Sequence, residues 1–281
     1  MAKKLTVTAR RAILLQMIKE KLLFVLGAQD PEMREIEKVL GTLQIPFVHA
    51  AKDNLRCSAN LAYSANSVVK VTAAKSQVVI LDPTKELVFV ETTLSRGNCV
   101  KQIDHHNPGD SGYAKSPSQY LEGSSLGQTL SFFGIEPTET QKLLAAADHC
   151  LTAAYQGQCP GVDPGELLFM RAAWHSLMSQ TTLSNVIDTI LTAAKHITKH
   201  YNPDTNESVF KDPTRVPHYL AEGAAYTGKP VRYRSLMPNG SLKEMLKGAV
   251  PSQIERFMQE HTTQGHQVYG NPHRGYAGAY L

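Results

Sequence analysis

An acid and two imidazoles stand side by side where an apolar segment of the sequence ends. Residues 100–103 run directly into Asp104, His105 and His106, and a Pro-Gly turn follows. A strand that opens into a polar loop is where α/β proteins place their chemistry. A carboxylate with two ring nitrogens suits a divalent metal or general acid–base catalysis. The same tripeptide also fits a polar loop whose histidines cap neighbouring backbone groups, so other residues have to decide between these interpretations.

Further acids follow other apolar runs of the chain. Residues 22–26 are apolar throughout, as expected of a strand covered on both faces, and Asp30 and Glu32 stand just beyond them at the start of a predicted helix. Glu91 closes a second apolar run, LVFVE. Two of these acids have structural alternatives, because Asp30 can cap the helix and Glu32 can interact with the helix dipole. We nevertheless predict that the three acids converge with His105 on one metal site.

An Asp-His pair lies inside an alanine- and leucine-rich segment that predicts a helix over residues 139–154. Asp148 and His149 are either partnered in the core or directed at a site, and the high cost of burying an unpaired carboxylate favours the site. We therefore add Asp148 to the acids expected near His105. His149 has a simple alternative as a core or surface imidazole. Three other histidines are predicted to be helix-surface residues only: His175, His196 and His200.

The elements that position these residues alternate between strands and helices, which is typical of an α/β protein. Strands are predicted at residues 22–26, 45–48, 78–82, 87–91, 230–235 and 242–248. Helices are predicted at residues 31–43, 139–154, 164–178, 183–200 and 251–260, with one more after Ser124 or Ser125 as its cap. Residues 201–217, rich in Asn, Asp and Pro, indicate a linker. Two domains follow: residues 1–201, including the helical segment 139–201, and residues 202–281.

The last segment of the chain, QVYGNPHRGYAGAYL, is rich in glycine around a single arginine. Glycines let a backbone approach a ligand closely, and arginine binds phosphate or carboxylate with a planar pair of donors. The structural alternative is a glycine-rich hairpin formed by the last two strands. The residues that we single out as substrate-binding candidates are Gly270, Asn271, His273, Arg274, Gly275 and Gly278.

Composition limits the classes of function. The hydrophobic content of 42% and a mean hydropathy of −0.25 predict a soluble globular protein. A formal net charge of +4 without a long basic run does not indicate binding to duplex nucleic acid, although it is compatible with phosphorylated small molecules. The first residues predict a short amphipathic helix rather than a signal peptide, because Lys19, Glu20 and Lys21 interrupt the apolar run. No stretch is long enough to cross a bilayer, so we expect no membrane partner.

The four cysteines are far apart in the sequence and form no C-x-x-C pair, which argues against a zinc knuckle or a disulfide scaffold. We expect reduced, buried thiols in a cytoplasmic protein. The cysteines are Cys57, Cys99, Cys150 and Cys159.

Together, these residues resemble a known family. D-P-E at residues 30–32, the acid-terminated strand at Glu91, D-H-H at residues 104–106 and the later Asp148 occur in the order of the four motifs of the DHH phosphoesterases. That family includes RecJ-like exonucleases, nano-RNases, cyclic-dinucleotide phosphodiesterases and family II inorganic pyrophosphatases. G-N-P-H-R-G-Y-A-G near the end is similar to the glycine-rich motif of their accessory domain. The resemblance implies a Rossmann-like parallel-sheet domain followed by a small α+β accessory domain that binds substrate.

Several roles follow from the resemblance alone. It implies that Asp30, Glu32, Glu91, Asp104, His105 and Asp148 belong to a metal site, with Asp104 orienting His105 and His106 facing the substrate phosphate. Two features depart from the family pattern. Leu26 occupies the position of a motif histidine, which His149 would have to replace, and Glu32 and Glu91 stand where the family usually has aspartates. These departures leave open one ion, two ions, or a non-hydrolytic descendant.

The function that this resemblance implies is metal-dependent hydrolysis of a phosphodiester or phosphoanhydride, with catalytic roles for Asp104, His105 and His106. Carboxylate and imidazole ligands suit Mn²⁺, or Mg²⁺, as one or two ions. The expected substrate is a phosphorylated small molecule or a short oligonucleotide, and a homodimer is compatible with it. The alternatives are a nucleotide-sensing protein that kept the site and lost turnover, and a metal-dependent hydrolase of a substrate other than phosphate.

Overall fold

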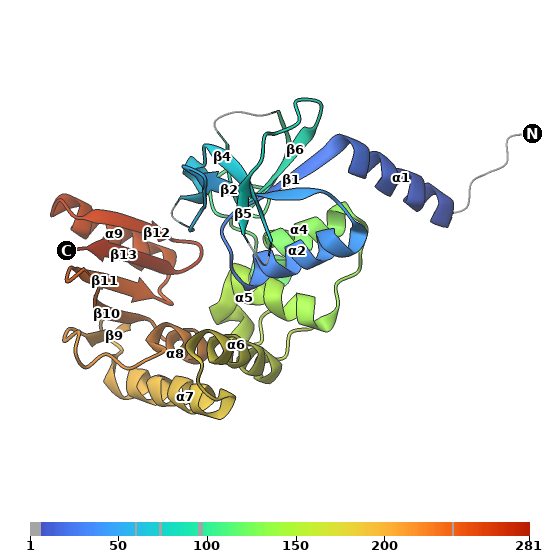
Figure 1. The fold of residues 1–281 in the computed structure, drawn as a ribbon. Helices are drawn as coiled ribbons and strands as arrows, with labels where there is room; N and C mark the ends of the chain where they lie inside the picture. The colour runs from blue at the N-terminus through green and yellow to red at the C-terminus, as the bar shows by residue number, and fades with distance from the viewer. Residues whose placement is uncertain (1–6, 60, 73–74, 95–97, 238) are drawn as a thin grey trace, which may run out of the picture. The chain divides into compact units, whose positions relative to one another are not determined.

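The computed structural model describes residues 7–59, 61–72, 75–94, 98–237 and 239–281. The chain forms two compact units, and each contains a β-sheet with helices (Figure 1). The first unit comprises Met1–Lys115 and Leu121–Ala145, and the second comprises Ser116–Tyr120 and Ala146–Leu281. A sheet with parallel strands, helices packed on it and a second sheet together confirm the predicted α/β class.

The first unit contains most of the predicted strand–helix alternation. Its helices are α1 (Val7–Lys21), α2 (Pro31–Leu43), the 3-10 helix η1 (Ala62–Ser64), α3 (Tyr120–Gly123), α4 (Ser125–Phe132) and the start of α5 (Glu139–Tyr155). Its strands are β1 (Leu22–Leu26), β2 (Phe47–Lys52), β3 (Leu55–Arg56), β4 (Ser67–Val71), β5 (Ser76–Val78), β6 (Glu86–Val90) and β7 (Cys99–Ile103). The order in the sheet is β5-β4-β2-β1-β6-β7, with β3 beside β2.

The register of the parallel strands brings their carboxyl ends into line. Leu26 of β1 is opposite Val90 of β6, and Val90 is opposite Ile103 of β7. Backbone hydrogen bonds continue this alignment by one residue, since Glu91 N–H donates to the Ile103 carbonyl oxygen at 3.0 Å. Glu91 and Asp104 therefore follow neighbouring strands at one edge of the sheet.

Apolar side chains on both faces of this sheet explain the continuous hydrophobic runs. On one face, Phe24 and Val88 pack against α2 and α4 in a cluster that includes Ile36 and Leu126. On the other face, Val25 and Phe89 pack with Cys57, Ala62 and Ala65. α2 starts where the sequence predicts, because the Asp30 carboxylate accepts a hydrogen bond from Met33 N at 2.7 Å and Pro31 occupies the first turn. Ser124 caps α4 in the same way, through Gly127 N at 2.9 Å.

Two predicted strands of this unit are shifted. The strand expected at residues 78–82 is instead β5 (Ser76–Val78), an antiparallel edge strand, and Ile80 beyond it is 94% exposed. The apolar run there leads into a turn in which Asp82 accepts hydrogen bonds from Thr84. The strand expected at residues 45–48 begins two residues later as β2, because Ile45 belongs to the core that closes α2.

The second unit carries a separate, largely antiparallel sheet. Its helices are η2 (Pro117–Gln119), the rest of α5, α6 (Pro164–Ser179), α7 (Leu183–His200), α8 (Leu220–Thr227) and α9 (Pro251–Thr263). Its strands are β8 (Tyr201–Asn202), β9 (Glu207–Phe210), β10 (Val231–Leu236), β11 (Leu242–Lys247), β12 (Gln267–Asn271) and β13 (Tyr276–Tyr280). The order in the sheet is β12-β13-β11-β10-β9-β8.

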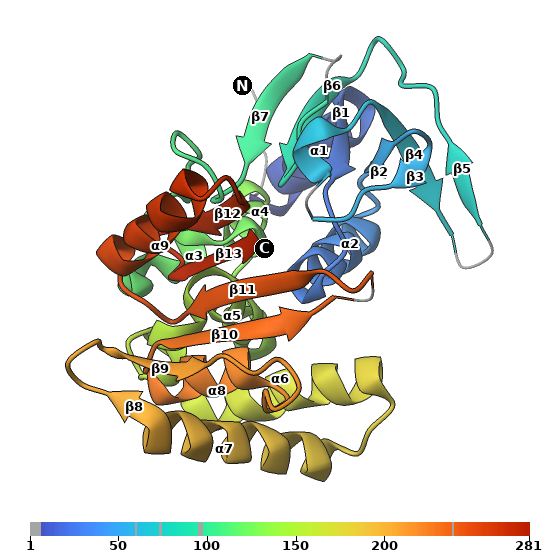
Figure 2. The same cartoon turned by 90° about the vertical axis from the view of Figure 1, so that its left-hand side faces the viewer.

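Helices cover both faces of the second sheet. α7 and α8 pack against β9 and β10 (Figure 2), where Ile197 and Leu220 contact Val231, and α9 packs through Phe257 on the Ala277 side. Because β8 and β9 belong to this sheet, residues 201–217 are not the linker that their composition indicates. α6 and α7 lie in the second unit, whereas the domain boundary predicted after residue 201 places them in the first domain. Where one domain ends and the next begins stays a prediction.

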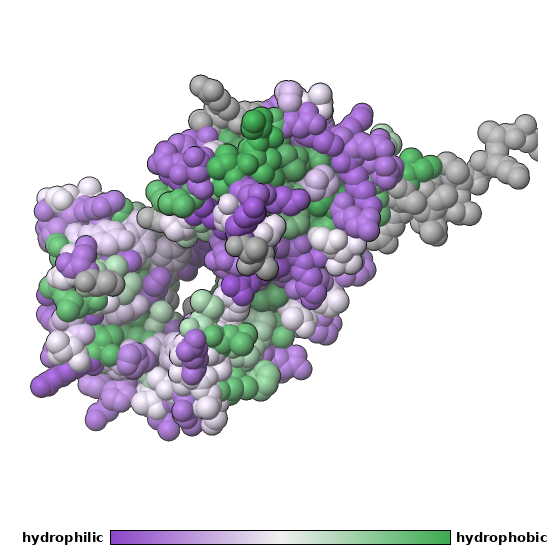
Figure 3. All heavy atoms as spheres, viewed as in Figure 1, coloured by the Kyte–Doolittle hydropathy of each residue, from purple (hydrophilic) through white to green (hydrophobic). Residues whose placement is uncertain are grey.

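The surface mixes hydrophilic and hydrophobic residues over both units (Figure 3). Among the described residues, no helix is both long enough and apolar enough to span a membrane.

Candidate metal centre

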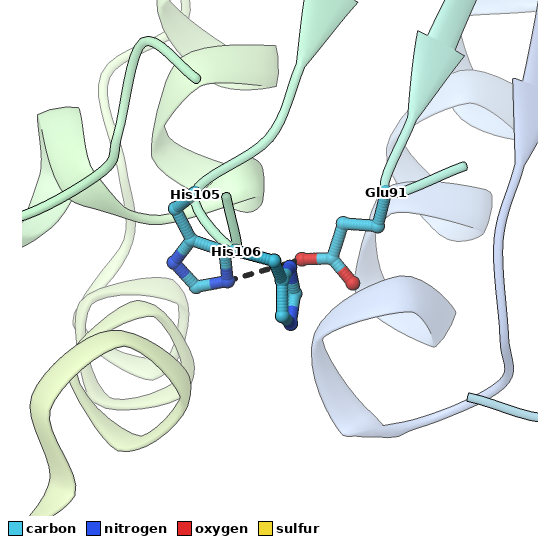
Figure 4. A group of neighbouring side chains, drawn as sticks. All are labelled: Glu91, His105 and His106. Atoms are coloured by element: carbon cyan, nitrogen blue, oxygen red, sulfur yellow. Dashed lines mark ion pairs between the residues drawn. The ribbon is translucent and has the colours of Figure 1, made fainter. Parts of the chain in front are cut away.

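Glu91 and His105 meet at the carboxyl edge of the first sheet. Their side chains point toward each other from the ends of β6 and β7 (Figure 4), and His105 Nε2 lies 3.3 Å from Glu91 Oε1. The His105 side chain is fully buried, and that of Glu91 is 8% exposed. Glu91 Oε1 accepts no hydrogen bond from the residues that the structure describes. Glu91 and His105 thus form an ion pair in which both side chains are buried.

A second buried carboxylate, that of Glu32, joins this pair. Glu32 stands in the first turn of α2 and is 2% exposed, and its Oε1 accepts a hydrogen bond from Leu126 N at 2.8 Å. Glu32, Glu91 and His105 each offer a ligand atom within 4.8 Å of the others. His106 forms a similar group with Glu91 and His105. These four residues bring together two carboxylates and two imidazoles that are distant in the sequence.

The Asp104 carboxylate serves the loop rather than this group. It accepts hydrogen bonds from the backbone N–H groups of His105 and His106, at 2.7 and 3.1 Å. It also accepts from the Tyr63 hydroxyl at 2.9 Å and the Gln102 amide at 3.1 Å. The ring that contacts it is that of His106, through Nδ1 at 2.9 Å, whereas the sequence predicts Asp104 as the orienter of the His105 ring.

These contacts keep Asp104 ionised and leave His106 partly open. Burial raises the pKa of the Asp104 carboxyl, but the hydrogen bond and charge of His106, together with the Tyr63 hydroxyl, hold that pKa below its usual range. The His106 ring is 26% exposed, and its plane is nearly perpendicular to that of His105. Asp104 thus fixes the orientation of the His106 ring through Nδ1.

Glu91 adopts a strained backbone conformation. Its φ is +50°, in the left-handed region that residues other than glycine rarely occupy. The neighbouring strand end makes room for it, since a Cβ on Gly27 would collide with the Glu91 carbonyl oxygen. Strain of this kind costs about 1–3 kcal/mol and persists at functional sites. The bend after β6 turns the Glu91 side chain toward His105.

The donor set fits a divalent cation. Two carboxylates this close and this deeply buried repel each other when both are ionised, and a bound cation removes that repulsion. Mixed carboxylate and imidazole ligands suit Mn²⁺ or Zn²⁺, and Mg²⁺ through the oxygens. Glu32, Glu91 and His105 can therefore hold a metal ion.

Other predicted ligands have local roles in the structure. Asp30 caps α2, as its structural alternative states, and Leu26 is part of the core. Asp148 and His149 lie on α5 in the second unit, where Arg274 donates to the Asp148 backbone oxygen at 2.6 Å. The Arg274 guanidinium is also 3.4 Å from both Asp148 carboxylate oxygens. The roles of Asp148 and His149 as metal ligands stay predictions.

The glycine-rich segment forms the hairpin of β12 and β13. Gly270 and Gly278 lie in its strands, and His273, Arg274 and Gly275 lie in its turn. Asn271 fixes the turn, because its side-chain oxygen accepts a hydrogen bond from Arg274 N at 3.1 Å. Arg274 is therefore held by the turn at its backbone and by Asp148 at its guanidinium.

Beside this turn, tyrosines and lysines alternate on the sheet face opposite α9. Lys243 Nζ lies 4.5 Å from the Tyr269 ring centroid and 5.1 Å from that of Tyr280. Lys247 Nζ lies 4.4 Å from the Tyr276 centroid. We call these five residues the tyrosine–lysine face. A Cβ at Gly278 would collide with the Tyr269 ring, so glycine lets that ring lie across the sheet.

The lysines of this face sit close to other cations. Burial, then the charges of Lys243 and Arg274, lowers the pKa of Lys247 to about 8. An anion bound here would raise the pKa of Lys247 again. The tyrosine–lysine face and Arg274 thus form a surface suited to an anion with an aromatic group.

The second unit also buries a carboxylate, and an arginine there balances its negative charge. Glu222 on α8 is 4% exposed and accepts a bidentate pair of hydrogen bonds from Arg171 on α6, at 2.9 and 2.7 Å. Tyr155 donates to it at 2.8 Å, and His175 Nε2 lies 3.3 Å away. His175 is therefore part of a buried ion-pair network and not the simple surface histidine that the sequence predicts.

The sequence reasoning missed Tyr63 and Gln102, which hold Asp104. Gln102 had a usable signal, because residues two apart on a strand share a face and Gln102 precedes Asp104 by two. Tyr63 has none, since it stands in a polar stretch 41 residues earlier.

Known sequences and known structures give different results for this chain. No protein-family model and no curated protein sequence match the chain. Solved structures do match, among them the pGpG-specific phosphodiesterase PggH from Vibrio cholerae, at 9% sequence identity and a TM-score of 0.41. That alignment covers 93% of this chain and 92% of that chain. A likeness of this degree does not bear on function, which the side chains themselves have to support.

Proposed function

We propose that this protein is a metal-dependent phosphohydrolase that cleaves a phosphodiester or phosphoanhydride bond in a nucleotide or short oligonucleotide. The ion is Mn²⁺ or Mg²⁺, bound as one or two ions. The observation that carries the proposal is the meeting of Glu32, Glu91 and His105 within 4.8 Å, in buried surroundings at the carboxyl edge of a parallel sheet. Active sites of α/β proteins form at this edge.

The chain's own residues have distinct tasks in this proposal. When bound, a divalent ion activates water and neutralises charge on phosphoryl oxygens. Glu32, Glu91 and His105 hold that ion. His106, fixed by Asp104 through Nδ1, presents its other nitrogen to a phosphoryl oxygen or to the leaving group, where it donates a hydrogen bond or a proton. Burial of the cluster excludes bulk water and strengthens each of these interactions.

The tyrosine–lysine face supports a substrate that carries bases. Bases stack on aromatic side chains, with about 1–3 kcal/mol per base, and lysine neutralises phosphate beside them. Tyr269, Tyr276 and Tyr280 supply rings, and Lys243, Lys247 and Arg274 supply charge. Inorganic pyrophosphate would make no use of the rings. A nucleotide or short single strand therefore fits this surface better than an inorganic substrate.

The test is elemental analysis of the purified protein followed by assays with added manganese. The substrates are linear dinucleotides, cyclic dinucleotides, pyrophosphate and bis-p-nitrophenyl phosphate. We expect bound metal and turnover of a dinucleotide, with little turnover of pyrophosphate. His105→Ala should lose the metal and the activity together, whereas His106→Ala should keep the metal and lose kcat.

Two outcomes would redirect the proposal. Metal bound with no turnover of any substrate would favour a nucleotide sensor that keeps the site. Activity that survives both His105→Ala and treatment with a chelator would show that this cluster is not the active site.

A further inference from the structure

Two thiols touch at the end of α5. Cys150 Sγ and Cys159 Sγ are 3.3 Å apart, and neither forms a disulfide in the structure. Cys159 is 3% exposed, in the turn after the helix, and Cys150 is half-buried on the helix itself. Cys57 and Cys99 both belong to the first unit. The pair is therefore local to the second unit, and its members are nine positions apart in the sequence.

The backbone of α5 departs from a helix at the first of these thiols. Cys150 has φ −151° and ψ 54°, which interrupts the helix between Glu139 and Tyr155. A sharp kink in a helix normally has a proline, a glycine pair or an inserted group as its cause, and no proline or glycine occurs in this helix. The kink and the following turn bring the two sulfur atoms into contact, so a disulfide needs only a small approach of atoms that already touch.

We propose that Cys150 and Cys159 form an oxidation site that closes to a reversible disulfide under hydroperoxide. The sulfur of the half-buried Cys150 attacks one peroxide oxygen: an S–O bond forms, the O–O bond breaks, and with H₂O₂ one water leaves, which takes up the thiol proton. Cys159 then attacks the resulting sulfenic acid, so that the S–S bond forms and a second water leaves. The two thiols lose two electrons and two protons in total, and one peroxide is reduced to two waters.

The position of this pair gives its oxidation a structural consequence. Asp148 precedes Cys150 by two residues, and Arg274 binds the Asp148 backbone oxygen at 2.6 Å. A bond between Cys150 and Cys159 would fix the kinked segment that presents this oxygen. The redox state of the pair would therefore be transmitted to the turn that carries Arg274, independently of whether the protein is a phosphohydrolase.

The experiment uses the reduced full-length protein and hydrogen peroxide. Both cysteines lie in one tryptic peptide, residues 143–171, so the disulfide appears under non-reducing conditions as that peptide lighter by two hydrogens. We expect this product to form at low peroxide with the loss of two free thiols, and dithiothreitol to restore both. Cys99→Ser, which removes an exposed thiol elsewhere, should leave the product unchanged.

The variants separate the proposal from general oxidation. Cys159→Ser should stop the reaction at a sulfenic acid on Cys150, which dimedone traps, and Cys159→Ala is the alternative if serine disturbs the buried turn. The proposal is overturned if Cys150 and Cys159 stay reduced while Cys99 oxidises, or if peptide 143–171 gains oxygen without ever losing two hydrogens in the wild type.

Discussion

Two of the places where the protein buries carboxylates compensate their charge in different ways. In the second unit, Glu222 is held by the guanidinium of Arg171 in a bidentate pair, with Tyr155 and His175 alongside. In the first unit, the ion pair of Glu91 is with an imidazole, and a second buried carboxylate, Glu32, stands within 4.8 Å. The cluster around Glu222 contains a permanent cation, the Arg171 guanidinium. The cluster around Glu91 contains two acids beside an imidazole.

The difference separates a structural network from a candidate ligand site. A buried ion pair with arginine is complete within the protein, and removing either partner leaves an uncompensated charge. Two neighbouring buried acids raise the free energy of the folded state unless a cation joins them. The same residue type therefore stabilises the fold at position 222 and is expected to bind an ion at position 91.

The largest effect should come from Glu91→Gln. The amide keeps the size of the side chain but removes its charge, so metal affinity and activity should fall by more than the roughly 10–100-fold that loss of an outer partner of a ligand causes. Elemental analysis and kcat/KM with the preferred substrate measure the two losses. The matched control is Glu86→Gln, at the exposed start of the same strand, which should change neither. With chelator present, Glu91→Gln should be at least as stable as the wild type; a clear loss of stability there would make the cluster structural.

The same substitution at Glu222 should have the opposite pattern. Glu222→Gln leaves Arg171 buried without its counter-charge, and we expect a loss of about 3–5 kcal/mol of unfolding free energy in urea with metal content unchanged. Burial raises the pKa of Glu222, but Arg171 and His175 hold it well below its usual range. Its contribution is therefore present above the unfolded-state pKa of about 4.3, and it is lost as the pH falls from there through the folded-state pKa. A variant whose stability at neutral pH equals that of the wild type would contradict this.

The smallest effect concerns Arg274 in the second unit. A charged bidentate contact to phosphate is worth on the order of 1.5–3 kcal/mol, so Arg274→Ala should raise KM at least about tenfold while metal content stays constant. Arg274→Lys should recover part of the loss, because lysine supplies charge without the planar fork. Steady-state measurements of kcat and KM with the preferred substrate test this prediction. Unchanged kcat/KM would mean that Arg274 serves only to hold Asp148.

Sequence patterns predicted several elements of both units closely. The run at residues 22–26, the cap at Asp30 and the helices α6 and α7 appear almost as expected, because strong apolar runs and cap residues act locally. β8 and β9 were missed since four residues or fewer of polar strand carry no periodic signal, and the partner that defines them, β10, comes later in the chain. α8 was missed because its short alanine- and glycine-rich sequence carries little periodic signal, and its apolar residues Leu220 and Ala224 find their partners in tertiary packing.

For the candidate site, the sequence indicated which residues gather there but not which side chains contact each other. The order of acids and histidines indicated Glu32, Glu91 and His105, and the structure brings these three together. Which ring Asp104 holds depends on side-chain directions at the end of β7, and the sequence does not encode these in any spacing. Tyr63 reaches Asp104 because its neighbours Ala62 and Ala65 pack on the sheet, which is a tertiary effect.

The left-handed backbone at Glu91 has a consequence for anyone who engineers or evolves this protein. Glycine or asparagine would adopt a φ of +50° at lower cost, so each would relieve strain at this position. Selection for thermal tolerance alone would therefore accumulate these replacements and discard the glutamate with its candidate ligand oxygen. A library screened only for survival of heating would drift toward a robust chain without this candidate ligand, so a screen for ion binding is needed beside it.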